Sequence, residues 1–201
     1  MITGAASGIG KEIALEFAQQ GAKVSIGDID DEAEKTVQEI EDMGAEALFT
    51  KTDVSAAEDV NHLIDATVEK FGRLDHAFNN AGMLNDVNRL DDVPVEEFNQ
   101  VIDSDMKGVC LAMEYELNYM EENGGGTMVN TASVAGLIAD PKMPLYVAAK
   151  HGVVGLTKST GFDYAEKNIR VNTVAPGLVE TATRKYRLLK STFVFQLLVI
   201  L

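Results

Sequence analysis

Short β-branched apolar runs alternate along this chain with longer segments in which apolar residues recur every three or four positions. This alternation is typical of a βαβ series, in which helices cover a parallel sheet. In the first helical segment Ile9, Ile13 and Phe17 share one face, and Gly21 is placed to end the helix. The pattern therefore predicts an α/β fold with a parallel sheet.

The same pattern predicts where the elements lie. Strands are expected at residues 1–2, 23–28, 47–51, 77–79, 127–131 and 170–174. Helices are expected from the glycine loop to Gly21, around Val37 and Ile40, after Ser55, and over residues 95–122 and 145–166. Pro176 and Gly177 end the last clear strand.

Both ends of the chain are unusual for such a sheet. Only Met1 and Ile2 precede the glycine loop, where a strand of about five residues is usual, so we expect a truncated first strand. After Glu180 the sequence becomes basic and then apolar. We expect one domain over residues 1–183 and an atypical basic, then apolar tail over residues 184–201, with the last strand absent or atypical. Alternatively, residues 193–201 add an unusual edge strand.

Composition excludes several classes of partner. The chain is 46% hydrophobic and 24% charged, as in a globular protein, and carries a formal charge of −15. Such a surface repels phosphate backbones and anionic lipid, so neither nucleic acid nor a membrane is an expected partner. Cys110 is the single cysteine and no export signal precedes the glycine loop, which favours the cytoplasm. His62, His76 and His151 lack ligand spacing, so no metal site is expected.

A glycine-rich stretch lies between the first strand and the first helix. Its candidate cofactor-binding residues are Gly4, Ser7, Gly8, Ile9 and Gly10. Glycines here would let a pyrophosphate approach backbone N–H groups at the helix N-terminus. The spacing G-x-x-x-G-x-G differs from G-x-G-x-x-G, and a plain glycine turn is the alternative.

Acidic residues follow the second strand. Asp28 ends that strand 18 residues after Gly10, where a carboxylate can accept hydrogen bonds from ribose hydroxyls. Asp30, Asp31 and Glu32 follow, and no Arg or Lys stands beside them to bind a 2′-phosphate. NAD is therefore expected in preference to NADP. For the last three residues, an acidic helix start is the alternative.

Taken together, several motifs resemble those of the short-chain dehydrogenase/reductase family. They are the glycine loop, Asn79-Asn80-Ala81-Gly82, Ser133, Tyr146-Val-Ala-Ala-Lys150 and Pro176-Gly177, in family order over residues 2–183. The resemblance implies a single Rossmann-like domain with a doubly wound parallel sheet in three α/β/α layers. It also implies hydride transfer between NAD(H) and a small secondary alcohol or ketone, and a possible homodimer or homotetramer.

Tyr146 and Lys150 carry the expected chemistry. Residues four apart share a helix face, so the two side chains can converge. A tyrosine has an ordinary pKa of about 10, and a neighbouring ammonium group favours the phenolate. Tyr146 is the candidate base that takes the alcohol proton, and the resemblance implies that Lys150 also holds the nicotinamide ribose and that Ser133 binds the substrate oxygen. An ordinary surface pair and a strand-end turn are the alternatives.

The resemblance also implies that further residues contact the cofactor. Asp53 and Val54 are implied near the adenine, and Asn80, Ala81 and Gly82 along the adenosine ribose. The residues implied near the nicotinamide carboxamide are Pro176, Gly177, Val179 and Thr181. Turn chemistry is the alternative for each, and Asp53 could instead cap the following helix.

One catalytic position departs from the family pattern. Asp105 stands in Asp105-Met106-Lys107-Gly108, where the family usually has Asn. A carboxylate can still accept hydrogen bonds but loses the amide donors, so we expect reduced or altered activity. With the unusual ends, this leaves a rival interpretation, a truncated, non-catalytic NAD-binding remnant or interaction protein.

Overall fold

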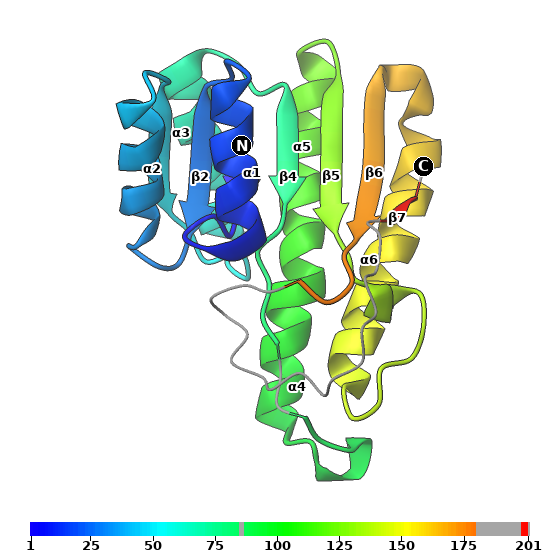
Figure 1. Ribbon diagram of the computed structural model, residues 1–201. Coiled ribbons are helices and arrows are strands. Elements are labelled where there is room, and N and C mark those ends of the chain that lie inside the picture. Colours follow the sequence, from blue (N-terminus) through cyan, green and yellow to red (C-terminus); the bar gives the residue numbers. More distant parts are fainter. Residues whose placement is uncertain (85–86, 180–197, 201) are drawn as a thin grey trace.

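The computed structural model describes residues 1–84, 87–179 and 198–200. Its strands form a single sheet in the order β3-β2-β1-β4-β5-β6-β7 (Figure 1). The strands are β1 (Ile2–Thr3), β2 (Val24–Asp28), β3 (Ala47–Lys51), β4 (His76–Asn79), β5 (Gly126–Thr131), β6 (Ile169–Ala175) and β7 (Leu198–Ile200). The first six pair in parallel, and the strand order reverses between β1 and β4. This is a doubly wound, Rossmann-like sheet, as expected.

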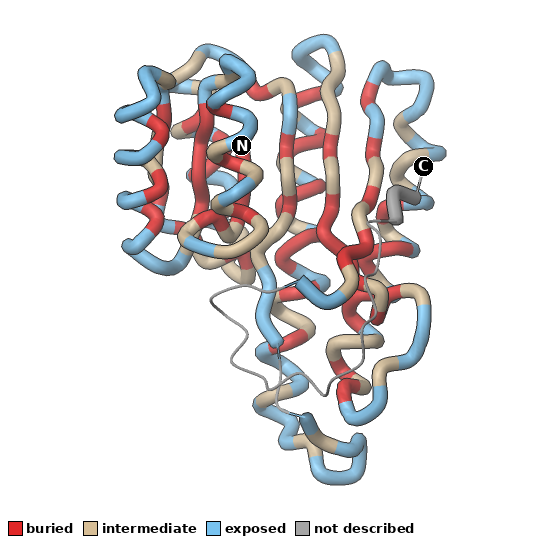
Figure 2. Tube along the Cα trace, viewed as in Figure 1, coloured by how far each residue is buried: buried red, intermediate tan, exposed pale blue. Residues whose placement is uncertain are grey.

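Helices cover both faces of the sheet. They are α1 (Gly8–Gln19), α2 (Ala33–Asp42), α3 (Ala57–Phe71), α4 (Val95–Ile102), α5 (Gly108–Glu122) and α6 (Pro144–Asp163). On one face α1 and α2 pack with β1 to β3 around Ala14, Ile26 and Ile40. On the other, α3, α5 and α6 enclose the larger core, which includes Leu63 and Met120. Figure 2 shows buried residues along the strands between these layers.

The first strand is short, as the sequence predicts. In β1, Ile2 pairs with Ile26 of β2 and Phe78 of β4. The Met1 amine donates to the carbonyl oxygen of His76 at 2.8 Å, and burial lowers the pKa of this amine to about 6. A cavity of about 580 Å³ lies at the amino ends of the strands, where Met1 and Phe78 are among the residues that line it. The cavity is thus at the opposite end of the sheet from the predicted cofactor site.

The structure corrects two of the helices expected from the sequence. The helix expected over residues 95–122 is interrupted between α4 and α5 by a segment of π-helix, Asp103–Lys107, called here the π-turn. The helix expected over residues 145–166 ends at Asp163 and is followed by a 3-10 turn, Ala165–Lys167. The pattern of apolar residues predicts one continuous helix over this range and does not reveal the π-turn.

The fully buried face of α1 lies beside the apolar stripe of Ile9, Ile13 and Phe17, of which Ile13 is partly buried against the core. Gly10, Ala14 and Ala18 are its buried residues, whereas Phe17 is 38% exposed. Small side chains occupy this face because the helix lies close to the glycine loop. A Cβ on Gly10 would lie 2.0 Å from the Gly4 carbonyl oxygen. Packing distance, rather than hydrophobicity, therefore decides which face of α1 is buried.

The C-terminal end forms an atypical edge. In β7, residues Leu198–Ile200 pair antiparallel with β6, Thr173 opposite Ile200. This confirms an atypical last strand and agrees with the alternative of an unusual edge strand. The rest of the expected tail over residues 184–201 lies outside the described residues, as does Thr181. The division into residues 1–183 and a tail stays a prediction.

Candidate active site

The candidate site lies at the carboxyl edge of the sheet, where the loops after the parallel strands meet. Thr3 joins two of these loops, because its Oγ1 accepts hydrogen bonds from the backbone N–H groups of Asn80 at 3.0 Å and Ala81 at 3.1 Å. The Asn80 Nδ2 atom donates in return to the carbonyl oxygen of Gly4 at 2.9 Å. The glycine loop and the Asn80–Gly82 segment are therefore held together by these hydrogen bonds.

The glycine loop presents the N-terminus of α1. This helix begins at Gly8, and the side chain of its N-cap residue, Ser7, makes no capping hydrogen bond within the described residues. The first N–H groups of a helix lack intrahelical partners, and the helix dipole favours negative charge at that end. This arrangement fits a dinucleotide pyrophosphate, for which Gly4 and Ile9 would line the approach.

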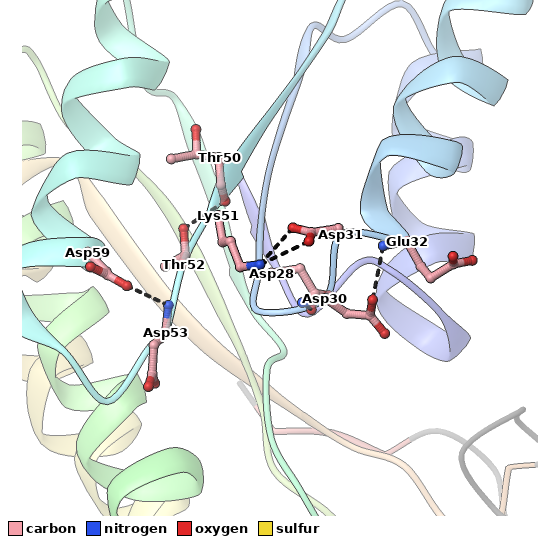
Figure 3. Close-up of polar contacts among 9 residues, drawn as sticks. All are labelled: Asp28, Asp30, Asp31, Glu32, Thr50, Lys51, Thr52, Asp53 and Asp59. Carbon is pink, nitrogen blue, oxygen red and sulfur yellow. Dashed lines mark hydrogen bonds and ion pairs between the residues drawn. The ribbon is translucent and has the colours of Figure 1, made fainter.

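Asp28 lies beside the glycine loop at the end of β2 (Figure 3). Its Oδ2 accepts from the Ala6 backbone N–H at 2.8 Å, and its Oδ1 accepts from that of Asp30 at 2.9 Å. Each carboxylate oxygen keeps a further lone pair, so the side chain can still accept from a ribose hydroxyl. Asp28 therefore both fixes the loop and presents a negative charge to the cofactor side.

The structure corrects one premise about the neighbouring acidic residues. No basic residue adjoins them in the sequence, but Lys51 at the end of β3 reaches Asp31, with its Nζ atom 2.9 and 3.0 Å from the two carboxylate oxygens (Figure 3). The hydrogen bond to Asp31 raises the pKa of Lys51. The lysine is brought there because Lys51 pairs with Asp28 in the register of β2 and β3.

Asp53 and Val54 shape the loop after β3. Asp53 Oδ1 accepts from the backbone N–H and hydroxyl of Ser55 at 2.9 and 2.7 Å, and its own N–H donates to Asp59. The N-cap residue of α3 is Ala56, so Asp53 forms a turn and does not cap that helix. Val54 is buried against Gly108, where a Cβ would lie 2.8 Å from a Val54 methyl group.

Three of the four candidate catalytic residues come from two adjoining segments. Ser133 follows β5 and caps a 3-10 turn, Val134–Gly136, by accepting from the Ala135 N–H at 3.1 Å. This turn packs against α6, which carries Tyr146 and Lys150. The Lys150 Nζ atom lies 5.5 Å from the centre of the Tyr146 ring and donates to the carbonyl oxygen of Thr131 at 3.1 Å. The expected convergence of Tyr146 and Lys150 is thus observed.

Asp105 lies at the centre of the π-turn and is fully buried. Its Oδ1 accepts from the Met83 backbone N–H at 2.7 Å, and its Oδ2 lies 3.3 Å from Lys150 Nζ. Burial raises the pKa of Asp105, while the charge of Lys150 acts in the opposite direction. A Cβ on Gly82 would lie 3.2 Å from Oδ1, so the glycine lets this loop approach the carboxylate closely.

The loop after β6 reaches the same edge. The Val134 N–H donates to the Pro176 carbonyl oxygen at 2.9 Å, which ties the loop to the turn after Ser133. Gly177 is half-buried and Val179 is exposed. The expected neighbour Thr181 is outside the described residues.

Sequence reasoning missed several contacts that build the site. Thr3 stands directly before Gly4, yet its role in holding the Asn80 segment depends on a residue 77 positions away. The Met83 N–H and the Thr131 carbonyl oxygen act through the backbone, which no residue type reveals. The position of Thr3 directly before the glycine loop is the one sequence feature that could have indicated this link between the two loops.

Comparison with known protein families identifies the family to which a chain with this site belongs. The family model described as short chain dehydrogenase matches residues 1–191. The chain belongs to the short-chain dehydrogenase family. It is therefore an oxidoreductase that transfers hydride between a nicotinamide cofactor and the carbon of an alcohol or ketone, and these comparisons do not favour the non-catalytic alternative.

Named relatives are enzymes of this family. The chain is 46% identical to the cyclohexanol dehydrogenase of Acinetobacter sp. (strain SE19) over 182 residues, which are 90% of this chain and 72% of that protein. It is 41% identical to the levodione reductase of Leifsonia aquatica over 184 residues, which are 90% of this chain and 69% of that protein. It is also 41% identical to the 2,5-dichloro-2,5-cyclohexadiene-1,4-diol dehydrogenase of Sphingobium indicum (strain DSM 16412 / CCM 7286 / MTCC 6364 / B90A), over 90% of this chain and 72% of that protein.

Solved structures of short-chain dehydrogenases share the fold. The crystal structure of levodione reductase aligns with a TM-score of 0.88 at 40% identity, covering 90% of this chain and 72% of that one. NAD⁺-bound xylitol dehydrogenase aligns at 0.85 with 34% identity, covering 88% of this chain and 68% of that one. ElxO with NADP bound aligns at 0.84 with 37% identity, covering 90% and 74%. Either nicotinamide cofactor thus occurs among these neighbours.

Two further findings concern the described part of the chain. No three His, Cys, Asp or Glu side chains in it come together as a metal site would require. None of its helices has the length and apolarity needed to cross a membrane.

Proposed function

We propose that this chain interconverts a six-membered-ring secondary alcohol and its ketone with NAD(H). The observation that carries the catalytic assignment is the Lys150 ammonium group 5.5 Å from the centre of the Tyr146 ring, on a helix packed against the turn that Ser133 caps. The ring preference is supported by two relatives, whose names specify cyclohexanol and a cyclohexadiene diol as substrates.

The reaction divides between the cofactor and the residues of the chain. When bound, the oxidised nicotinamide accepts the hydride that leaves the alcohol carbon. The Ser133 hydroxyl donates a hydrogen bond to the substrate oxygen. The Tyr146 phenolate takes the hydroxyl proton as the carbonyl forms, and in reduction the phenol returns that proton. The Lys150 ammonium group favours the phenolate form of Tyr146.

Charge at the adenosine end of the site supports NAD over NADP. Asp28 faces the glycine loop, and Asp30, Asp31 and Glu32 follow it. Two basic groups contact this acidic run, and each is already held by one of its carboxylates, Lys51 by Asp31 and Lys35 by Glu32. A 2′-phosphate placed here would meet more negative than positive charge, which disfavours binding.

Turnover by the purified chain tests both proposals together. Cyclohexanol and acyclic secondary alcohols would each be supplied with NAD⁺ or NADP⁺, and reduced cofactor would be followed by absorbance. We expect the largest kcat/KM with cyclohexanol and NAD⁺. Tyr146→Phe should lower kcat by at least about a thousandfold, because the proton acceptor is lost.

Tyr164→Phe is the matched control, since Tyr164 lies at the other end of α6 and should leave kcat unchanged. Unchanged turnover in Tyr146→Phe would refute the catalytic assignment, and faster turnover with NADP⁺ would refute the cofactor preference. Thermal stabilisation by NAD without turnover of any alcohol would instead favour a cofactor-binding protein without catalysis.

A further inference from the structure

The π-turn places a carboxylate against the lysine of the candidate site. Asp105 Oδ2 lies 3.3 Å from Lys150 Nζ, and both side chains are almost completely buried. This oxygen makes no well-directed hydrogen bond within the described residues, so its contact with Lys150 is chiefly an ion pair. Buried charges are weakly screened by salt and water, so each of the two acts strongly on its surroundings.

Other charges near this end of α6 do not compete for Lys150. The remaining charged side chains on α4 and the π-turn are Glu96, Glu97, Asp103 and Lys107. Within the described residues none of them forms an ion pair with Lys150 or Asp105, and Asp103 pairs with Lys107 at 3.5 Å on the half-exposed side of the π-turn. Within the described residues, Asp105 and Lys150 therefore pair with each other and with no other charged side chain, next to Tyr146.

Such a pair changes what the lysine does to the tyrosine. A lone ammonium group 5.5 Å from the ring centre stabilises a phenolate, since opposite charges attract. A carboxylate on the same ammonium group cancels part of that field and repels the phenolate directly. A neutral amide at position 105 would do neither, because it carries no net charge.

We propose that Asp105 is a positioning residue that partly compensates the charge of Lys150 and so moves the ionisation of Tyr146, and with it alcohol oxidation, to higher pH. Its contribution to activity rests on the proposed function. Its effect on Tyr146 is a property of the chain alone and can be measured without substrate or cofactor.

The contacts of Asp105 make a clean substitution available. Asn has the same shape, and its Oδ1 can keep the hydrogen bond from the Met83 N–H, which is 2.7 Å long, while its Nδ2 donor then faces Lys150 Nζ in place of the carboxylate oxygen. In Asp105→Asn the carboxylate charge disappears while the loop remains held. Asp105→Ala removes the charge together with that hydrogen bond, so it provides a second variant with the same electrostatic change.

Absorbance of the tyrosinate ion as a function of pH tests the inference. Five tyrosines contribute to this signal, so the curve of Tyr146→Phe is subtracted to isolate Tyr146. The same subtraction in the Asp105→Asn background gives the midpoint without the carboxylate. We expect that midpoint to fall by about one pH unit, the size of effect that a charge several ångströms away has at an effective dielectric constant of about 20.

Asp105→Ala should lower the midpoint in the same direction, whereas Asp103→Asn, which removes the half-exposed carboxylate two residues away, should leave it in place. An unchanged or higher midpoint in both Asp105 variants would overturn the inference. In the active enzyme, the acid limb of kcat/KM for alcohol oxidation should move with the midpoint. A chain that oxidises no alcohol but shows the shift would contradict the proposed function and support the role of Asp105.

Discussion

Two buried carboxylates lie on the same helical stretch, and their surroundings differ. Asp105 in the π-turn and Glu116 on α5 are eleven residues apart, about three helical turns, and both are 0% exposed. Asp105 faces the ammonium group of Lys150 at 3.3 Å. Glu116 accepts one hydrogen bond, from Asn79 Nδ2 at 3.0 Å, and its other oxygen has no partner within the described residues.

The two environments act differently on the acids. Burial raises the pKa of Glu116 to about 7, and the Asn79 hydrogen bond and the charge of the Met1 amine only partly oppose this. The pKa of Asp105 is also raised by burial, but there the full charge of a lysine opposes the shift. The comparison teaches that burial alone does not give a carboxylate its role. The paired carboxylate adjoins the candidate catalytic residues, whereas the unpaired one belongs to the core.

The largest expected effect comes from removing the cation that Asp105 faces. Lys150→Met leaves a buried carboxylate without its ammonium partner, and we expect unfolding at pH 8 to require about 3 to 5 kcal/mol less free energy. Urea denaturation measures this. The control is Lys150→Met combined with Asp105→Asn, which shares the lost hydrogen bond to the Thr131 carbonyl oxygen but has no buried charge. Equal stability of the single and double variants would show that the ion pair is unimportant.

A smaller effect should follow from neutralising the unpaired acid. The folded protein raises the pKa of Glu116 from 4.5 to about 7, so it binds the proton more tightly than the unfolded chain does. This contribution to stability is present below pH 4.5 and is lost as the pH rises through about 7. Glu116→Gln keeps an oxygen for Asn79 and does not titrate. We expect equal stability near pH 4 and a gain of roughly 2 to 3 kcal/mol for the variant at pH 8.

Urea denaturation of the parent and of Glu116→Gln at several pH values follows this difference. The Met1 amine titrates in both proteins, with a pKa near 6, so most of its effect cancels in the comparison. A difference in stability that does not grow between pH 5 and pH 7 would show that Glu116 is not held in its neutral form by burial.

The smallest expected effect concerns an exposed carboxylate on the same π-turn. Asp103 and Lys107 are about half exposed, and their charged atoms are 3.5 Å apart. Exposed ion pairs contribute little, because water and salt screen them and two long side chains lose freedom. Asp103→Asn should therefore change the free energy of unfolding by less than about 0.5 kcal/mol. A loss as large as that of Lys150→Met would remove the distinction between buried and exposed charge.

Much of the strand pattern was predictable from the sequence. The strand expected at residues 47–51 has those bounds in the structure, and the other parallel strands differ from the expected bounds by one residue at one or both ends. Short apolar runs bounded by turn residues indicate buried strands because both faces of a parallel sheet are covered. The candidate site was predictable to the same extent, since Tyr146 and Lys150 lie on one helix, where a spacing of four guarantees a shared face.

The contacts between distant segments were not predictable. Lys51 is brought to Asp31 by the register of β2 and β3, and Thr3 reaches Asn80 because β1 and β4 are neighbours in the sheet. The buried face of α1 is set by its close approach to the glycine loop, which its apolar residues do not reveal. Each of these depends on where another part of the chain lies.

The sequence by itself determined the order of strands and helices, the glycine loop and the spacing of the candidate catalytic residues, because these depend on local periodicity and on residues close together in the chain. Only the tertiary structure decided that Asp105 is paired with Lys150 and that Glu116 is left with a single amide. Ionisation depends on burial and on the charges within a few ångströms, and those neighbours are assembled only when the chain folds.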